Sequence, residues 1–210
     1  SGAFEKCDSL ERVDIQDLNP WWNITFGSKE ANPLYCGHNL YLNGKLVTEV
    51  TIPANNTTVP QYILAGASCI EKITIMDGVK SFGDQAFYKC SGLKEIVLPD
   101  SVTSLYGYLF AETGIISFKV PKGVTVLPYS LFEKCENLVS VEIHDNVTEI
   151  GSNCFRYCSS LKSIEIPNKV LEISSYTFGE CTAMEEVKIG GRVSKIGSFA
   201  FEKCLSLKSI

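Results

Sequence analysis

Few residues of this 210-residue chain could perform acid–base, nucleophilic or metal chemistry. The two histidines, His38 and His144, lie far apart, whereas a catalytic histidine needs both a nucleophile and an orienting group beside it. Cys36 and His38 could supply two ligands to a metal, but structural zinc takes four, usually as two pairs, and no second pair is present. The sequence therefore predicts no enzyme activity, no cofactor and no metal site.

Charged side chains recur at outward positions of short β-branched segments, where strand side chains alternate between core and solvent. The candidate partner-binding residues of this kind are Glu95, Lys119, Glu142, His144, Glu165 and Lys188. One interpretation is a mixed-charge binding stripe along an exposed sheet, and the other is a set of solvated positions that only keep the sheet soluble. His144, placed on a strand next to Glu142, is interpreted first as a solvated surface histidine.

The densest aromatic cluster comprises Trp21, Trp22, Phe26, Tyr35 and Tyr41. Aromatic side chains dominate binding hot spots, so Trp22 joins the candidate partner-binding residues, with either a protein or a carbohydrate as partner. The favoured alternative is that at least one tryptophan anchors this segment onto the rest of the chain, because a lone hairpin is barely stable.

A regular repeat explains where most of these residues stand. Aligned on one aromatic column, the copies from Leu64 onward are spaced by 22 or 23 residues. The column consists of Phe4, Leu64, Phe87, Phe110, Phe132, Phe155, Phe178 and Phe201. Each copy reads approximately F-x-x-C-x-x-L-x-x-I-x-I, often followed by proline. Self-similarity at this period indicates a solenoid, in which each unit buries its apolar face by stacking on its neighbours.

Each copy predicts one short strand, such as residues 93–98, with Ile96 and Leu98 pointing into the core and Glu95 and Val97 pointing out. One strand per copy builds a parallel sheet, and the remainder forms short helical or irregular turns on the opposite side. Glycines that recur just before this turn indicate either a positive φ or a close backbone approach. They are Gly83, Gly151 and Gly197.

The nine cysteines mostly follow the same repeat. Six occupy one column: Cys7, Cys90, Cys135, Cys158, Cys181 and Cys204. Other copies place Ala67 or Thr113 there, so the column needs a small, largely apolar side chain, and Cys154 occupies another such column. Parallel side chains on neighbouring turns have poor disulfide geometry, which predicts free, buried thiols. Cys36 and Cys69 lie off the pattern and are the thiols expected to be exposed.

A single domain is expected over residues 1–210, with about eight repeats and incomplete terminal copies. An insertion at 17–50 interrupts the period, because Phe4 and Leu64 are 60 residues apart, which is one repeat of 23 plus 37. Asn43–Gly44 within this insertion is a strong two-residue hairpin signal. The chain starts within one repeat and stops within another, so we expect a longer repeat protein.

Composition excludes two classes of partner. The net charge is −5 and no block of Lys or Arg is present, which argues against nucleic acid. Purely apolar runs are only a few residues long, far short of the ~20 that cross a bilayer, so membrane insertion is not expected. No signal peptide is recognisable at the start of the sequence.

The column pattern A-F-x-x-C-x-x-L-x-x-I-x-I-P-x-x-V-x-x-I-G resembles the BspA-type (Treponema pallidum type) leucine-rich repeat. The insertion, W-x-x-I-x-F-G…N-P-L-Y…N-L-Y-L-N-G-K-L, is similar to an excursion that recurs among such proteins. The departures are small: the Phe110 copy is one residue short with Thr113 in the cysteine column, and the Leu64 copy lacks both Phe and Cys. The resemblance implies a β-rich leucine-rich repeat solenoid of the α/β repeat class, with a parallel β-sheet on its concave face.

The same resemblance implies a cell-surface or secreted protein of a family discussed as adhesins, without family-wide catalytic residues. We therefore expect a non-enzymatic binding or adhesion module that recognises a protein or glycan on a host or neighbouring cell. Two alternatives stay open. One is a structural spacer or stalk of a larger surface protein, and the other is carbohydrate binding through the aromatic insertion.

Overall fold

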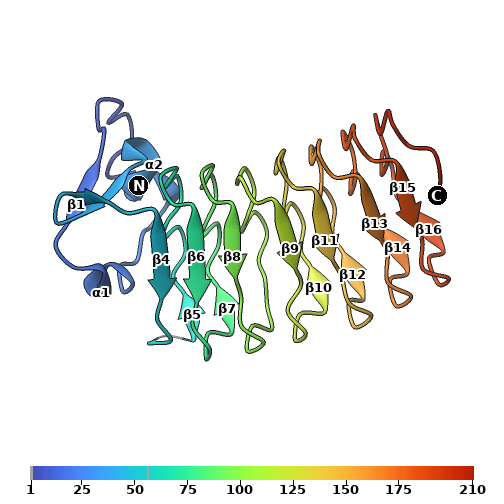
Figure 1. The fold of residues 1–210 in the computed structure, drawn as a ribbon, viewed down its shortest axis with the longest axis horizontal. Helices are drawn as coiled ribbons and strands as arrows, with labels where there is room; N and C mark the ends of the chain where they lie inside the picture. Colours follow the sequence, from blue (N-terminus) through green and yellow to red (C-terminus); the bar gives the residue numbers. More distant parts are fainter. Residues whose placement is uncertain (1, 56) are drawn as a thin grey trace.

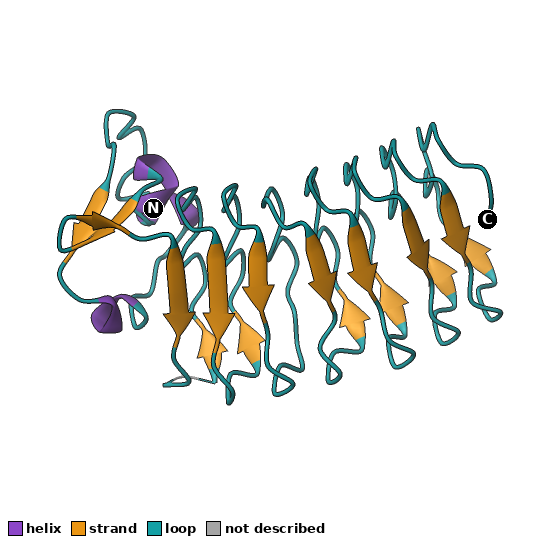
Figure 2. Ribbon diagram, in the orientation of Figure 1, coloured by secondary structure: helices purple, strands orange, loops and turns teal. Residues whose placement is uncertain are grey.

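The computed structural model describes residues 2–55 and 57–210, which form an elongated solenoid of about eight turns (Figure 1). Each turn after the N-terminal region contributes one strand to a front row, and most turns add a shorter strand to a back row (Figure 2). The front row comprises β4 (Glu49–Ile52), β6 (Lys72–Ile75), β8 (Glu95–Val97), β9 (Ser117–Lys119), β11 (Ser140–Glu142), β13 (Ser163–Glu165) and β15 (Glu186–Lys188). The back row comprises β5 (Thr58–Val59), β7 (Ser81–Phe82), β10 (Val126–Leu127), β12 (Glu149–Ile150), β14 (Glu172–Ile173) and β16 (Lys195–Ile196).

Strand pairing within both rows is parallel and joins equivalent positions of successive turns. Lys72 of β6 is in register with Glu95 of β8, and Thr58 of β5 is in register with Ser81 of β7, 23 residues away. The predicted parallel solenoid is therefore confirmed. Between the two rows the chain forms irregular turns, and the helices of the described residues all lie before residue 40.

The N-terminal region carries the remaining elements. They are β1 (Val13–Ile15), α1 (Leu18–Trp21), the 3-10 helix η1 (Lys29–Ala31), α2 (Leu34–Gly37), β2 (Leu40–Leu42) and β3 (Lys45–Leu46). β2 pairs in parallel with β1 and antiparallel with β3 across Asn43–Gly44. Both central residues of this turn have positive φ, as a type I′ turn requires. The indole of Trp21 donates to the carbonyl of Ile63 at 3.0 Å, which joins this region to the first regular turns.

The core is a stack of phenylalanine rings that runs along the solenoid. Phe132, Phe155 and Phe178 are fully buried, and their ring centroids are 5.5 Å apart at each step with nearly parallel planes. Phe87 and Phe110 extend the stack in one direction, with centroids 6.0 Å apart. Because each ring contacts the rings of both neighbouring turns, the stack couples the turns to one another.

The cysteine column has a hydrogen-bonding role beside its packing role. In five turns the cysteine thiol donates a hydrogen bond to a main-chain carbonyl of the preceding turn, at 2.9 to 3.2 Å. The acceptor is always the residue in the aromatic column. The donors are Cys90, Cys135, Cys158, Cys181 and Cys204. Thr113, which replaces cysteine in one turn, donates to the carbonyl of Phe110 at 2.7 Å. Cysteine and threonine in this column therefore donate a hydrogen bond as well as fill a small buried space, whereas Ala67 only fills it.

All nine cysteines are free thiols, as predicted, but four exposures differ from expectation. Cys204 was expected to be buried and is half-buried. Cys7 was expected to be buried and is exposed, because in this structure its turn has a neighbouring turn on one side only. Cys36 and Cys69 were expected to be exposed and are half-buried. Cys36 donates to the carbonyl of Phe4 at 3.3 Å, and the Cys69 sulfur accepts from the amide of Leu40 at 3.2 Å.

Burial of the thiols predicts a loss of stability at alkaline pH. Burial raises the pKa of the Cys135 thiol from 9.0 to about 11. Below pH 9 both folded and unfolded chains keep this proton, whereas between pH 9 and about 11 only the unfolded chain loses it. The free energy of unfolding should therefore fall across this window. Urea denaturation at several pH values measures the fall, and Cys135→Ala should show a shallower slope; an unchanged slope would contradict the prediction.

The recurring glycines mark a close backbone approach. Gly83, Gly151 and Gly197 all lack positive φ, but a Cβ on Gly151 would lie 2.5 Å from the amide nitrogen of Tyr129. A Cβ on Gly83 would similarly lie 2.3 Å from the amide nitrogen of Gln61. The positive φ angles fall two residues later, for example at Asn153. Of the two reasons the sequence left open, the close approach is the one that applies.

Candidate recognition surface on the front strands

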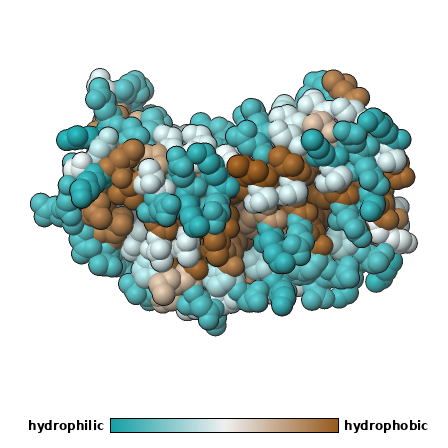
Figure 3. Space-filling model, viewed as in Figure 1, coloured by the Kyte–Doolittle hydropathy of each residue, from teal (hydrophilic) through white to brown (hydrophobic). Residues whose placement is uncertain are grey.

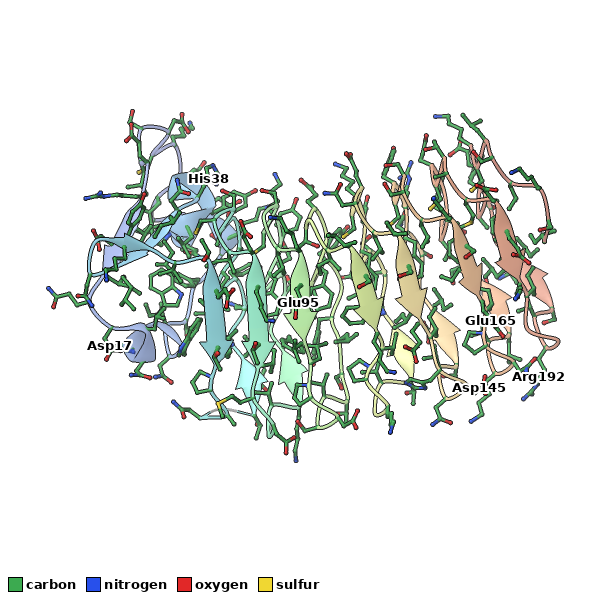
Figure 4. The ribbon with its side chains drawn as sticks, viewed as in Figure 1. Asp17, His38, Glu95, Asp145, Glu165 and Arg192 are labelled. Atoms are coloured by element: carbon green, nitrogen blue, oxygen red, sulfur yellow. The ribbon has the colours of Figure 1, made fainter. Side chains whose placement is uncertain are left out.

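The front row of strands presents one exposed face, called here the front face. In β9, β13 and β15 the two outer residues point to solvent and the central residue is buried. On β9, Ser117 and Lys119 are exposed while Phe118 packs in the core. This alternation follows from the two-residue period of a strand. Glu95 and Glu165 lie on this face in β8 and β13 (Figure 4).

The front face is hollowed between β9 and β15 by a cavity of about 580 Å³. Ser117 and Ser140, the first residues of β9 and β11, line it with short side chains. Ser163, the first residue of β13, lines a smaller neighbouring cavity. The charged side chains Lys119, Glu142, Glu165 and Lys188 line the cavity. The structure thus brings four of the seven predicted partner-binding residues together.

The four charges differ in the partners they already have. Lys119 and Glu142 form an ion pair at 2.9 Å, with both side chains largely exposed, so the pair adds little stability. Glu165 and Lys188 face each other in register on β13 and β15, yet within the described part of the chain neither forms an ion pair. Their charges therefore keep hydrogen-bonding capacity for a ligand.

Glu95 belongs to a different part of the front face. Its carboxylate pairs with the ammonium of Lys72 at 2.7 Å, and this contact raises the pKa of Lys72. Both side chains are more than a third exposed. Because β6 and β8 are the second and third strands of the front row, the pair lies toward the N-terminal end of the front face and outside the cavity.

Two predicted site residues lie elsewhere than expected. His144 was placed on a strand but follows the end of β11, and it is half-buried. Its Nε2 lies 2.9 Å from the carbonyl oxygen of Pro121 and its Nδ1 accepts from the amide of Asn146. Trp22 is 4% exposed and part of the core. A partner cannot reach its indole, so the anchoring interpretation applies to both tryptophans instead.

An apolar patch on the front face was not anticipated. Val97, Ile116 and Val139 have exposed fractions of 44%, 48% and 41%. The amide of Val139 donates to the carbonyl of Ile116 at 2.8 Å, which fixes these two residues side by side on consecutive turns. Figure 3 shows hydrophobic side chains gathered over the middle of this face. Ile116 and Val139 are called the apolar patch below, and Val97 is a further exposed aliphatic residue on β8 of the same face.

The sequence did contain a signal for this patch. In five other turns the column of Ile116 and Val139 holds charged residues, namely Glu71, Lys94, Lys162, Glu185 and Lys208, and in the turn of β4 it holds Thr48. Four of the charged residues form two ion pairs across turns, Lys94 with Glu71 at 3.1 Å and Lys208 with Glu185 at 2.6 Å. The patch therefore lies where two aliphatic residues, Ile116 and Val139, replace charged residues in this column of the repeat.

The two histidines make main-chain contacts. Besides the contacts of His144, the Nδ1 of His38 lies 3.1 Å from the carbonyl oxygen of Gly66. Among the residues that the structure describes, no group of three or more His, Cys, Asp or Glu side chains could hold a metal ion.

Comparison with known families identifies the repeat. The model of the BspA type leucine rich repeat region matches in six copies, over residues 35–139 and 105–210. The chain belongs to this family. Repeats of the BspA-type leucine-rich repeat family commonly mediate protein interactions. Membership of this family therefore suggests a protein-interaction or surface module.

Solved structures similar to this BspA-type chain come from several bacteria. A leucine-rich repeat protein of T. pallidum is 24% identical with a TM-score of 0.66, covering 80% of this chain and 75% of that one. A leucine-rich repeat protein of Eubacterium ventriosum is 32% identical with a TM-score of 0.70, covering 78% of this chain and 44% of that one. A leucine-rich cell surface protein of Faecalibacterium prausnitzii is 23% identical with a TM-score of 0.53, covering 95% and 69%.

The first and third of these likenesses show the fold alone. The matched part spans less than half of the Eubacterium protein, so the role of that whole protein does not transfer. A comparison with curated proteins found no match. In the described part of this BspA-type chain, no helix has the length and apolarity to cross a membrane.

Proposed function

We propose that this chain is a non-enzymatic recognition module that binds a protein partner through its front face. The observation that carries the proposal is the position of the apolar patch beside the polar cavity on one exposed sheet. Ile116 and Val139 supply apolar area that is nearly half exposed. The cavity supplies Glu165 and Lys188, whose charges have no ion-pair partner among the described residues.

This combination resembles the general anatomy of protein interfaces. An apolar centre excludes water and contributes most of the affinity, while a polar rim provides orientation and specificity. Neighbouring turns lock each strand in register, so the front face is rigid before binding. A rigid surface loses little conformational entropy on association. Charged residues with intact pairs, such as Lys119 and Glu142, would contribute to the rim.

The substitution Val139→Glu tests the proposal. Purified protein is screened against immobilised extracellular matrix proteins by biolayer interferometry, and the strongest interaction is then measured with each variant. Placing a carboxylate in the apolar patch should weaken that interaction about tenfold or more, since a central hot-spot substitution commonly costs at least this much. Glu165→Lys, on the cavity side, should weaken it less.

Val126→Glu is the matched control. Val126 lies in β10 of the back row and is 39% exposed, close to the 41% of Val139. Its substitution should leave the interaction unchanged. Absence of binding to every matrix protein, or equal loss in the two variants, would overturn the proposal and favour a structural spacer.

A surface or secreted location is part of the same proposal. It rests on the family resemblance, and the Faecalibacterium protein, which is itself described as a cell surface protein, shares the fold. Immunofluorescence of intact cells that produce the natural protein, with and without permeabilisation, measures this directly. Staining only after permeabilisation would contradict it.

A further inference from the structure

A second polar surface lies along the turns that precede the front strands, where Gly114 and Asn137 lie two residues before Ile116 and Val139 of the apolar patch. It consists of three cavities that share walls. The middle cavity, of about 500 Å³, is lined by Tyr35, His38, Gly66, Ser68, Lys89, Ser91 and Glu112. Tyr35 and His38 also line a cavity of about 330 Å³ in the N-terminal region. Ser91 and Glu112 also line a third cavity of about 250 Å³. The three together are called the edge groove.

The edge groove follows one column of the repeat. The residue after the cysteine column lines it in five copies of the repeat, and His38 of the inserted segment lines it as well. The five are Asp8, Ser68, Ser91, Gly114 and Glu136. The main chain links the turns directly, since the amide of Ser68 donates to the carbonyl of His38 at 3.0 Å. Successive turns of such a stack are spaced by about 4.8 Å. This spacing is close to the length of one pyranose unit in an extended β-linked chain.

The edge groove contains both hydrogen-bond donors and acceptors. The carboxylate of Glu112 lies 3.7 Å from the ammonium groups of both Lys89 and Lys134, which is too long for a tight hydrogen bond. It also accepts from the hydroxyl of Tyr88 at 2.9 Å. The ammonium groups and the remaining carboxylate oxygen therefore keep capacity for sugar hydroxyls, which donate and accept at once.

An aromatic ring lies at the boundary of the two larger cavities. The ring of Tyr35 is half-buried, and the ammonium groups of Lys29 and Lys89 lie 5.4 and 5.7 Å from its centroid. These contacts hold the ring in place. Aromatic side chains have an apolar body beside a polar tip, and the C–H face of a pyranose packs on such a ring.

The lining of the edge groove excludes other classes of ligand. No exposed aliphatic side chain lines it, so it lacks an anchor for a hydrophobic peptide side chain. Its acidic side chains, Glu5, Asp8, Glu30, Glu112 and Glu136, outnumber its lysines, Lys6, Lys89 and Lys134. A polyanion would therefore be repelled.

We propose that the edge groove binds a linear, uncharged, β-linked oligosaccharide, with successive sugar units following successive turns of the solenoid. This site is independent of the front face, because its lining residues are distinct from the apolar patch and from the cavity between β9 and β15. The N-terminal region contributes Tyr35 and His38, and the regular turns contribute Ser68, Ser91 and Glu112.

The test is an array of immobilised linear β-linked oligomers of glucose, mannose and N-acetylglucosamine, probed with the purified chain. Binding to at least one of these series is expected, with affinity rising with oligomer length. Ser91→Trp fills the two cavities that share Ser91 and should weaken the best interaction about tenfold or more. Tyr35→Ala should weaken it comparably, whereas Tyr35→Phe, which keeps the ring, should retain it.

Ser159→Trp is the matched control because Ser159 occupies the same column in a later turn, outside the edge groove. The same column holds a large side chain in the last described turn, where Leu205 is 79% exposed. Glu165→Lys, in the front-face cavity and outside the edge groove, should also leave sugar binding unchanged, which separates failure of this proposal from failure of the front-face proposal. No binding to any uncharged oligomer, tighter binding of an acidic oligosaccharide or peptide, or full binding by Ser91→Trp would overturn it.

Discussion

Replacing Phe155 with alanine should lower the free energy of unfolding by about 3–5 kcal/mol, the usual cost of truncating a buried phenylalanine. Phe155 is fully buried and stacks at 5.5 Å on both Phe132 and Phe178. In a solenoid, each interface between turns contributes separately to stability. Removing the ring weakens two interfaces at once and leaves a cavity between them. Urea denaturation followed by circular dichroism measures the loss.

Phe199→Ala is the control for this prediction. Phe199 also stacks on an aromatic ring, that of Tyr176 at 4.9 Å, but it is 56% exposed. Its removal leaves no buried cavity, so the loss should be below about 1 kcal/mol. A similar loss for the two variants would show that the ring stack does not form the core.

Gly151→Ala should be nearly as destabilising, although it adds only one methyl group. The new Cβ would lie 2.5 Å from the amide nitrogen of Tyr129 and 2.8 Å from the carbonyl carbon of Pro128. Both are main-chain atoms, which cannot rotate away as a side chain can. Relief requires the two turns to separate, which strains the 2.8 Å hydrogen bond from the Gly151 amide to the carbonyl of Leu127. We expect a loss of about 3 kcal/mol, at the upper end of overpacking costs.

Gly27→Ala provides the comparison, because a Cβ there would meet no atom within 4 Å and its φ is not positive. Its effect should stay within about 0.5 kcal/mol. If Gly151→Ala were equally mild, the close packing of turns at this glycine column would be wrong.

These two predictions bear on recognition as well as on stability. The front face and the edge groove are both built from equivalent positions of successive turns, so their shapes depend on the spacing between turns. Phe155 and Gly151 fix that spacing from the core and from the main chain, respectively. By contrast, exposed substitutions such as Val139→Glu and Ser91→Trp leave the spacing intact. Their effects on binding can therefore be separated from unfolding.

Much of this architecture could be predicted from the amino-acid sequence. The phenylalanine column and the cysteine column recur in nearly every turn, and each copy meets the same surroundings. A burial assignment made for one copy, such as Cys158, therefore holds for the next, such as Cys181. The assignment fails for Cys7 because the first turn lacks a neighbour on one side, so the repeated surroundings are incomplete there.

The two proposed recognition surfaces depend on what the repeat does not encode. Trp22 looks like a ligand contact in the sequence, but it is buried because the N-terminal region folds back on the first regular turns. Ile116 and Val139 are 23 residues apart, and only the stacking of turns makes them one patch. The edge groove likewise needs Tyr35 and Ser91 to meet across that junction. The repeat period and the residue types determined the core, because the core contacts recur from turn to turn. The tertiary structure decided the proposed binding surfaces, because these surfaces arise where the repetition is broken.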